Sequence, residues 1–130
     1  MILRLFILSL LLPTIASSQT YQSNDIYINL NNEFILVDGV AFIDYNIKEK
    51  YVDLILGKSL HHYEIRKSRK QSSSQRFVVE FKGTRDLMFW NTKTHNALIC
   101  SFRIAGINYW FKELKEIDKK EFPEIKQNLN

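Results

Sequence analysis

Apolar and polar residues alternate along most of the chain with a period of two. This pattern is typical of β-strands, in which successive side chains point to opposite faces of a sheet. In the first such segment, Ile26, Ile28 and Leu30 alternate with Tyr27 and Asn29. The alternation returns at residues 52–56, 62–66, 77–81, 87–90, 98–104 and 107–111. The chain therefore predicts a series of short strands within residues 26–112.

The most specific local signal is the pair Asp38-Gly39, which lies between the apolar segments 34–37 and 40–43. Such a pair favours a two-residue hairpin turn, because glycine readily adopts positive φ. If Val37 faces Val40 across this turn, both faces of the hairpin are apolar. We therefore expect both faces to be covered by a second sheet, a helix, a partner or a ligand.

The spacing of apolar residues changes near the C-terminus. Leu114, Ile117 and Phe122 follow a helical spacing among Lys and Glu residues, and Pro123 ends the pattern. We predict a short helix over residues 113–122. The predicted fold is thus mostly β, either a small antiparallel sandwich or a partly closed barrel, with a short C-terminal helix laid against it. The alternation does not separate these two architectures.

Residues 1–18 have the composition of a cleavable signal peptide. Arg4 precedes an apolar run at residues 5–12, Pro13 interrupts it, and small residues follow up to Ser18. A membrane-spanning helix needs about 20 apolar residues, so an anchor fits this segment less well. We expect cleavage after Ser18, a secreted or periplasmic protein, and no transmembrane anchor after cleavage.

The remaining chain, residues 19–130, has the length of one domain with a single core. We expect its polar start, residues 19–25, to be loosely held. Removing Arg4 leaves 17 of the 18 Lys and Arg against 14 Asp and Glu, so the net charge is +3. This charge alone does not imply nucleic acid binding. Cys100 is the single cysteine, so no internal disulfide is expected, and its phase with Phe102 predicts a buried, inert thiol.

Basic residues gather around a polar stretch that contains no acidic residue. They are Arg66, Lys67, Arg69, Lys70 and Arg76. On a loop at one end of the domain, they would bind an anionic macromolecule or an acidic protein surface through an attraction that salt weakens. The competing interpretation is a solvated hairpin tip, because such tips are polar and basic residues also discourage edge aggregation.

Large rings are adjacent at Phe89-Trp90 and around Trp110. Neighbouring residues of a strand point to opposite faces, so some of these rings point away from the core. We therefore take Trp90 and Trp110 as candidate aromatic contacts for a partner. The alternative for each is a role as a core anchor, which is the commoner fate of such rings.

Three histidines, His61, His62 and His95, could supply acid–base chemistry with Asp53 or Glu80. Adjacent strand residues face opposite sides, so His61 and His62 do not readily share one metal ion. No spacing in the chain resembles a known set of metal ligands. We therefore predict no metal site and no cofactor.

These features support three functions. The first is a small exported binding protein, such as an inhibitor, that engages an anionic macromolecule through the basic loop. The second is a carrier of a small lipophilic ligand in a β-barrel pocket. The third is a histidine-dependent hydrolase, which rests only on the presence of the residues, so a binding protein is expected before an enzyme. An exposed apolar sheet face would also suit a homodimer.

Overall fold

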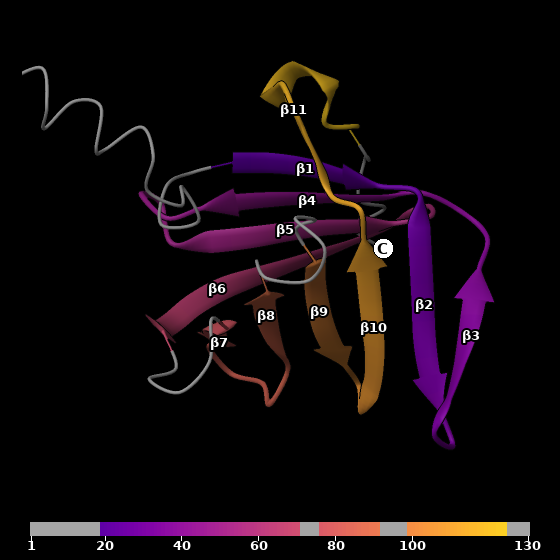
Figure 1. The fold of residues 1–130 in the computed structure, drawn as a ribbon. Coiled ribbons are helices and arrows are strands. Elements are labelled where there is room, and N and C mark those ends of the chain that lie inside the picture. Colours follow the sequence, from indigo (N-terminus) through magenta and orange to yellow (C-terminus); the bar gives the residue numbers. More distant parts are fainter. Residues whose placement is uncertain (1–18, 71–75, 92–98, 125–130) are drawn as a thin grey trace, which may run out of the picture.

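The computed structural model describes residues 19–70, 76–91 and 99–124 of the chain. These residues form eleven antiparallel strands in one curled sheet that makes a half-barrel (Figure 1). The strands are β1 (Gln19–Ser23), β2 (Asp25–Leu30), β3 (Glu33–Val37), β4 (Ala41–Asn46), β5 (Tyr51–Leu56), β6 (Ser59–Lys70), β7 (Arg76–Phe81), β8 (Leu87–Asn91), β9 (Ile99–Ile104), β10 (Ile107–Lys112) and β11 (Lys115–Ile117). The prediction of a mostly β, partly closed architecture is confirmed.

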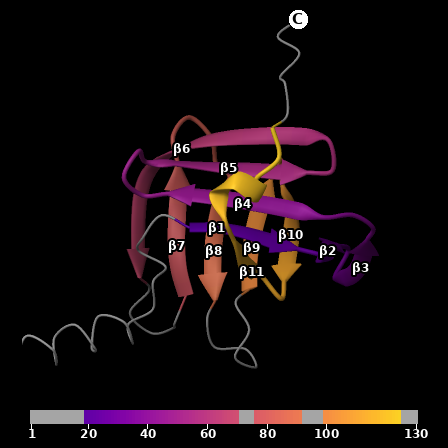
Figure 2. The ribbon, with the colours of Figure 1, turned by 90° about the horizontal axis from the view of Figure 1, so that it is seen from above.

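The sheet folds over on itself along β6, so that it forms two layers. The strand order is β11-β1-β4-β5-β6-β7-β8-β9-β10-β2-β3. The first half of β6 pairs with β5, its second half pairs with β7, and the register shifts between Ile65 and Lys67. We call the strands from β11 to the first half of β6 the first layer, and those from its second half to β3 the second layer. Figure 2 shows the strands of the two layers crossing.

The core fills the space between the two layers. Its largest fully buried side chains are Trp90, Tyr45, Phe102 and Phe111. The ring centres of Trp90 and Tyr45 lie 6.1 Å apart, and those of Phe102 and Phe111 lie 5.7 Å apart. Cys100 is fully buried, as predicted, and this burial raises the pKa of its thiol well above the usual value. Large aromatic side chains therefore occupy the interior of the half-barrel.

The prediction of a hairpin turn at Asp38-Gly39 is wrong. Strand β3 pairs with β2, whereas β4 pairs with β1 and β5 in the other layer. Asp38-Gly39 lies in the connection that leads from one layer to the other (Figure 1). The hairpin turn is instead Asn31-Asn32, with φ of 52° and 63°. Asparagine tolerates this left-handed conformation, which a tight turn between twisted strands requires.

The described part of the chain does not itself supply the predicted cover over both faces of residues 34–37, so cover by a partner or a ligand stays a prediction. Strand β3 lies at the end of the sheet, where its central side chains remain accessible. Phe34 is 58%, Ile35 42% and Leu36 60% exposed. The apolar pattern of this segment therefore reflects an exposed edge strand.

The two ends of the domain also differ from the prediction. The segment expected to be loosely held forms β1, in which buried Thr20 donates a hydrogen bond to buried Asp44 at 3.1 Å. In place of the helix predicted over 113–122, β11 pairs with β1, and Lys119–Glu121 forms one turn of 3-10 helix. A helix this short is marginal alone, whereas a strand here gains backbone hydrogen bonds to β1.

Candidate functional site

The second layer has an outer face that points away from the core, and strand pairing arranges its side chains in rows. One row consists of direct neighbours from β6 to β3: Arg69, Val78, Phe89, Ser101, Trp110, Tyr27 and Leu36. The row beside it consists of Lys67, Glu80, Leu87, Arg103, Asn108, Asn29 and Phe34. Paired residues of antiparallel strands share a face, so cations, rings, amides and the carboxylate of Glu80 lie together here.

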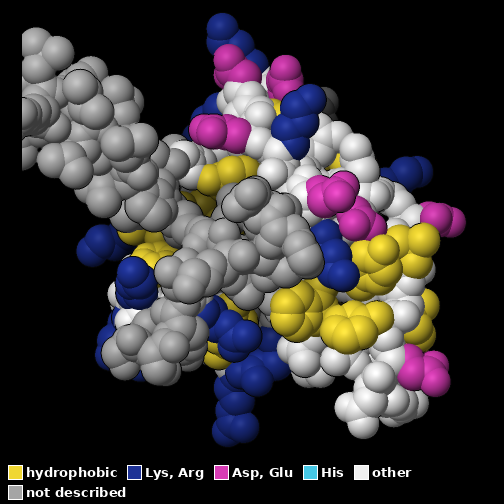
Figure 3. Space-filling model, viewed as in Figure 1, with side chains coloured by type: hydrophobic (Ala, Val, Ile, Leu, Met, Phe, Trp, Pro, Cys, Tyr) yellow, Lys and Arg dark blue, Asp and Glu magenta, His cyan; other side chains and the backbone are white. Residues whose placement is uncertain are grey.

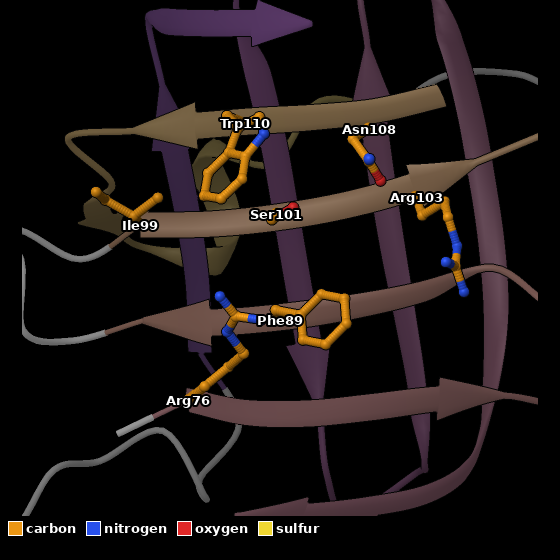
Figure 4. A pocket seen from close by; sticks show the side chains of 7 residues that line it. All are labelled: Arg76, Phe89, Ile99, Ser101, Arg103, Asn108 and Trp110. Atoms are coloured by element: carbon orange, nitrogen blue, oxygen red, sulfur yellow. The ribbon is translucent and has the colours of Figure 1, made fainter. Parts of the chain in front are cut away.

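A pocket with a volume of about 230 Å³ opens on this outer face (Figure 4). It is lined by Arg76, Phe89, Ile99, Ser101, Arg103, Asn108 and Trp110. The side chains come from four neighbouring strands, β7 to β10. The lining contains two guanidinium groups, an amide, a hydroxyl and two aromatic rings, and none of these lining residues is acidic. We refer to these seven residues as the outer pocket.

Two contacts show how the outer pocket combines charge with apolar surface. The guanidinium carbon of Arg76 lies 5.1 Å from the centre of the Phe89 ring. This cation–π arrangement positions the guanidinium beside an aromatic face. Trp110 lies across the pocket from Arg76 (Figure 4), and its buried indole Nε1 has no hydrogen-bond partner among the described residues. Buried indole N–H groups usually find an acceptor, and the described residues supply none for this donor.

Aromatic side chains and a cation continue from the pocket toward the edge of the sheet. The Nζ atom of Lys112 lies 4.5 Å from the centre of the Tyr27 ring and 5.9 Å from that of Phe34. Phe34 in turn meets Trp110 edge to face, with ring centres 6.0 Å apart. Figure 3 shows hydrophobic side chains together on this part of the molecule, over β10, β2 and β3.

A second hollow on the same layer differs in its charge balance. It has a volume of about 300 Å³, and its lining includes Arg66, Arg85 and Arg103 as well as Glu80 and Asp86. The Nη2 atom of Arg66 lies 2.9 Å from Oε1 of Glu80. Acidic groups therefore offset part of the positive charge in this hollow, which shares Arg103 with the outer pocket.

The structure brings together only some of the predicted basic residues. Lys67 and Arg69 share the outer face with Arg76, whereas Lys70 pairs with Phe77, whose side chain packs on the core side. Arg66 is engaged with Glu80. All of these except Arg76 belong to strand β6, so residues 67–70 are strand and not loop. Residues 71–75 of the predicted loop lie outside the described residues.

The two predicted aromatic contacts have different positions. Trp90 is 1% exposed and lies in the core, so a surface partner does not reach it. Trp110 lines the outer pocket. Arg103 and Asn108 were not among the predicted site residues, although the alternation in 99–104 and 107–112 assigns both to the face opposite Cys100 and Phe111. Strand order was the missing information, because the pocket forms only where β7 to β10 lie side by side.

The two described histidines, His61 and His62, have separate partners. Nδ1 of His62 lies 2.5 Å from Oδ1 of Asp53. The His61 ring stacks with the Tyr63 ring, and the two ring centres are 6.4 Å apart. His95 lies outside the described residues. Among the described residues, no three His, Cys, Asp or Glu side chains are grouped so as to hold a metal ion.

Comparisons with protein-family models, with curated proteins and with solved structures give no match for this chain. Within the described ranges, no helix is long and apolar enough to cross a membrane. Residues 1–18, which carry the predicted signal peptide, lie outside these ranges. Any functional inference therefore rests on the outer face itself.

Proposed function

We propose that this protein binds an anionic polysaccharide through the outer face of its second layer. The observation that carries the proposal is the outer pocket, where Arg76 and Arg103 line a hollow together with aromatic rings and no acidic side chain. The proposal keeps the predicted class, a small exported protein that binds an anionic macromolecule. It moves the centre of the site from the basic loop to the strands β7 to β10.

The chemistry of the lining suits a sugar that carries a carboxylate or sulfate. A guanidinium group donates two parallel hydrogen bonds to such a group, and charge-assisted bonds are the stronger ones. Phe89 and Trp110 offer flat apolar surfaces for a sugar ring, while Asn108 and Ser101 offer hydrogen bonds to hydroxyl groups. A volume of about 230 Å³ is below that of pockets for drug-sized ligands, so it suits one ring of a longer chain.

The length of the outer face supports a polymer as the ligand. Lys67 and Arg69 lie on one side of the outer pocket, and Lys112 lies on the other side above Tyr27. A chain that places one unit in the pocket can therefore meet further cations on both sides. The net charge of the whole chain is only +4, which by itself does not indicate nucleic acid.

The two alternative functions have less support in the described residues. A lipophilic carrier would need an interior cavity, whereas Trp90, Tyr45 and Phe102 occupy the interior with at most 1% exposure. A histidine-dependent hydrolase would need His62 beside further catalytic groups and a substrate pocket. His62 contacts Asp53 on the first layer, away from the lining of the outer pocket.

The test is a binding series with polygalacturonate, dextran sulfate and neutral dextran, measured by calorimetry at several salt concentrations. We expect one or both anionic polymers to bind, with an affinity that falls as salt rises, and neutral dextran to remain unbound. The double variant Arg76→Ser/Arg103→Ser should lose this binding. The matched control Lys48→Ser/Lys58→Ser removes the same charge from exposed positions outside the outer face. This control should still bind the polymer.

Single-stranded DNA and anionic lipid vesicles serve as competing probes in the same series. Binding of either, with no binding of both anionic polysaccharides, would contradict the proposal and assign the face to another partner. Equal loss of affinity in the two double variants would show that net charge, and not the outer pocket, governs the interaction.

A further inference from the structure

Strand β3 is the last strand of the second layer. Among the described residues, it pairs with β2 on one side and has no strand on the other. Its five residues are Glu-Phe-Ile-Leu-Val, and three of the central side chains are 42% to 60% exposed. Unpaired edges of this kind are templates for pairing with another strand. The exposed edge is therefore a candidate interaction surface that is separate from the outer pocket.

The turn that precedes β3 determines which of its backbone groups point to the free edge. Leu30 and Glu33 close the two-residue turn, and the closing pair of such a hairpin exchanges its hydrogen bonds. Bonded and non-bonded pairs alternate along the ladder, so Ile35 and Val37 also direct their N–H and C=O groups toward β2. The N–H and C=O groups of Phe34 and Leu36 consequently point outward.

The free edge lacks the features that normally prevent pairing. Protected edges are short or carry lysine, proline or a bulge. The opposite edge of the sheet follows this rule, because β11 has three residues, two of which are Lys115 and Glu116. Strand β3 contains neither lysine nor proline, and its register with β2 is regular.

We propose that two copies of this chain pair antiparallel through β3, centred on Ile35. This register is the one that overlaps all five residues of both strands. It places Phe34 opposite Leu36 of the second copy, and these are the residues whose backbone groups point outward. Glu33 then lies opposite Val37, so the one charged residue of β3 does not face its own copy. The interface is self-complementary, as a two-fold dimer requires.

This pairing joins the second layers of two copies into one continuous sheet. Directly opposite residues of antiparallel strands share a face, so Phe34 and Leu36 of both copies lie on the same side. The two outer faces then form one surface on the same side of the joined sheet. This consequence is separate from the identity of the ligand, because the pairing depends only on β3.

The test is the mass of the purified protein by light scattering across a concentration series. Leu36→Pro removes an N–H group that points to the free edge and leaves the bonds between β2 and β3 in place. We expect the unmodified protein to double its mass as concentration rises, and Leu36→Pro to stay monomeric. The control Leu36→Thr keeps the N–H group and should still dimerise, at a higher concentration.

Hydrogen exchange gives a readout that does not depend on a variant. In the unmodified protein, the amides of Phe34 and Leu36 should exchange rapidly at low concentration and become protected at high concentration. A monomeric mass throughout the series would overturn the proposal and leave the edge to a strand of another protein. A dimer in which these two amides stay unprotected, or that Leu36→Pro does not weaken, would also overturn it.

Discussion

The guanidinium carbon of Arg76 lies 5.1 Å from the centre of the Phe89 ring, on the face of the sheet that points away from the core. Arg76 begins β7 and Phe89 lies within β8, so the contact depends on the pairing of these two strands. It gives the outer pocket a cation whose position is fixed by an aromatic neighbour. A positioned guanidinium loses less conformational freedom when it binds an anion, which favours recognition at this place.

The outer pocket predicts the effect of removing one of its arginines. Arg103→Ser should lower the affinity for the anionic polymer that binds by about 10-fold to 100-fold, because a charge-assisted hydrogen bond contributes roughly 1.5–3 kcal/mol. Calorimetry at one fixed salt concentration measures this change. Lys48→Ser, on the first layer, is the matched control. An affinity within about twofold of the unmodified protein for Arg103→Ser would remove this residue from the site.

The turn at Asn31-Asn32 makes a prediction about stability. Asn32 has φ of 63°, so Asn32→Val should destabilise the protein by about 1–2 kcal/mol, the approximate cost of the left-handed conformation for such a residue. Asn32→Gly should be neutral or slightly stabilising, because glycine adopts this conformation freely. Urea denaturation of both variants measures the difference. Equal stability of the two variants would contradict the assignment of the turn.

Buried Asp44 predicts different effects for two of its partners. Thr20 donates a hydrogen bond to Oδ1 of Asp44 within the sheet, while exposed Lys119 lies 3.5 Å from Oδ2. Thr20→Val leaves a buried carboxylate oxygen without this donor and should cost about 1–3 kcal/mol of unfolding free energy. Lys119→Ala should cost under about 1 kcal/mol, because the Lys119 side chain is exposed and Tyr51 also donates a hydrogen bond to Oδ2 of Asp44. The opposite order in chemical denaturation would refute this account of the first layer.

Buried tyrosine and thiol groups predict a loss of stability at high pH. Burial, aided by the charge of Asp86, raises the pKa of Tyr63 from 10.0 to about 12. Burial also raises the pKa of the Cys100 thiol. Each raised pKa means that the folded state holds the proton more tightly than the unfolded state does, so the stabilisation is complete below the ordinary pKa and is lost as pH rises above it.

Urea denaturation between pH 8 and pH 12 measures this effect. The urea midpoint should fall steadily above about pH 9–10, where the unfolded thiol and phenol begin to ionise. The decline should be shallower for Tyr63→Phe, which removes one of the titrating groups. A midpoint that stays constant up to pH 12 would contradict the burial of these groups.

The alternation of apolar residues was sufficient to predict most strands of the second layer. Val79, Met88 and Phe102 are buried as their alternation indicates, while their neighbours Glu80, Phe89 and Arg103 face outward. Packing against a core imposes this period on the sequence, which is why the mostly β class could be predicted. The layered arrangement depends on strand order, which alternation does not encode.

The errors have local physical causes. Asp38-Gly39 fits a tight turn, yet the chain uses it to pass between layers, and Asn31-Asn32 makes the turn instead. Strand β1 contains few apolar residues, so alternation did not predict it. Its buried Thr20 is accommodated by a hydrogen bond to Asp44 and not by apolar packing. Pairing with β1 also determines the conformation of β11, which local spacing suggests is helical. A neighbouring turn prevails in the first case, and a contact distant in sequence prevails over the local signal in the other two.

The candidate site was predicted only in part for a related reason. Trp110 and Arg76 lie far apart in the sequence, and only the succession of β7, β8, β9 and β10 brings them to one pocket. The basic cluster was visible as a run of like residues, but alternation along β6 divides it between two faces. Charge composition therefore indicated the type of partner, whereas strand register determines which residues can meet it.

The most direct test of the account is the change in tryptophan emission when the anionic polymer is added. Trp110 lines the outer pocket, whereas Trp90 is enclosed in the core, so ligand binding should alter the emission of Trp110 selectively. We predict a saturable change that disappears in Trp110→Phe and weakens as salt rises. The same change in Trp110→Phe, or no change in the unmodified protein while calorimetry detects binding, would contradict the proposed site.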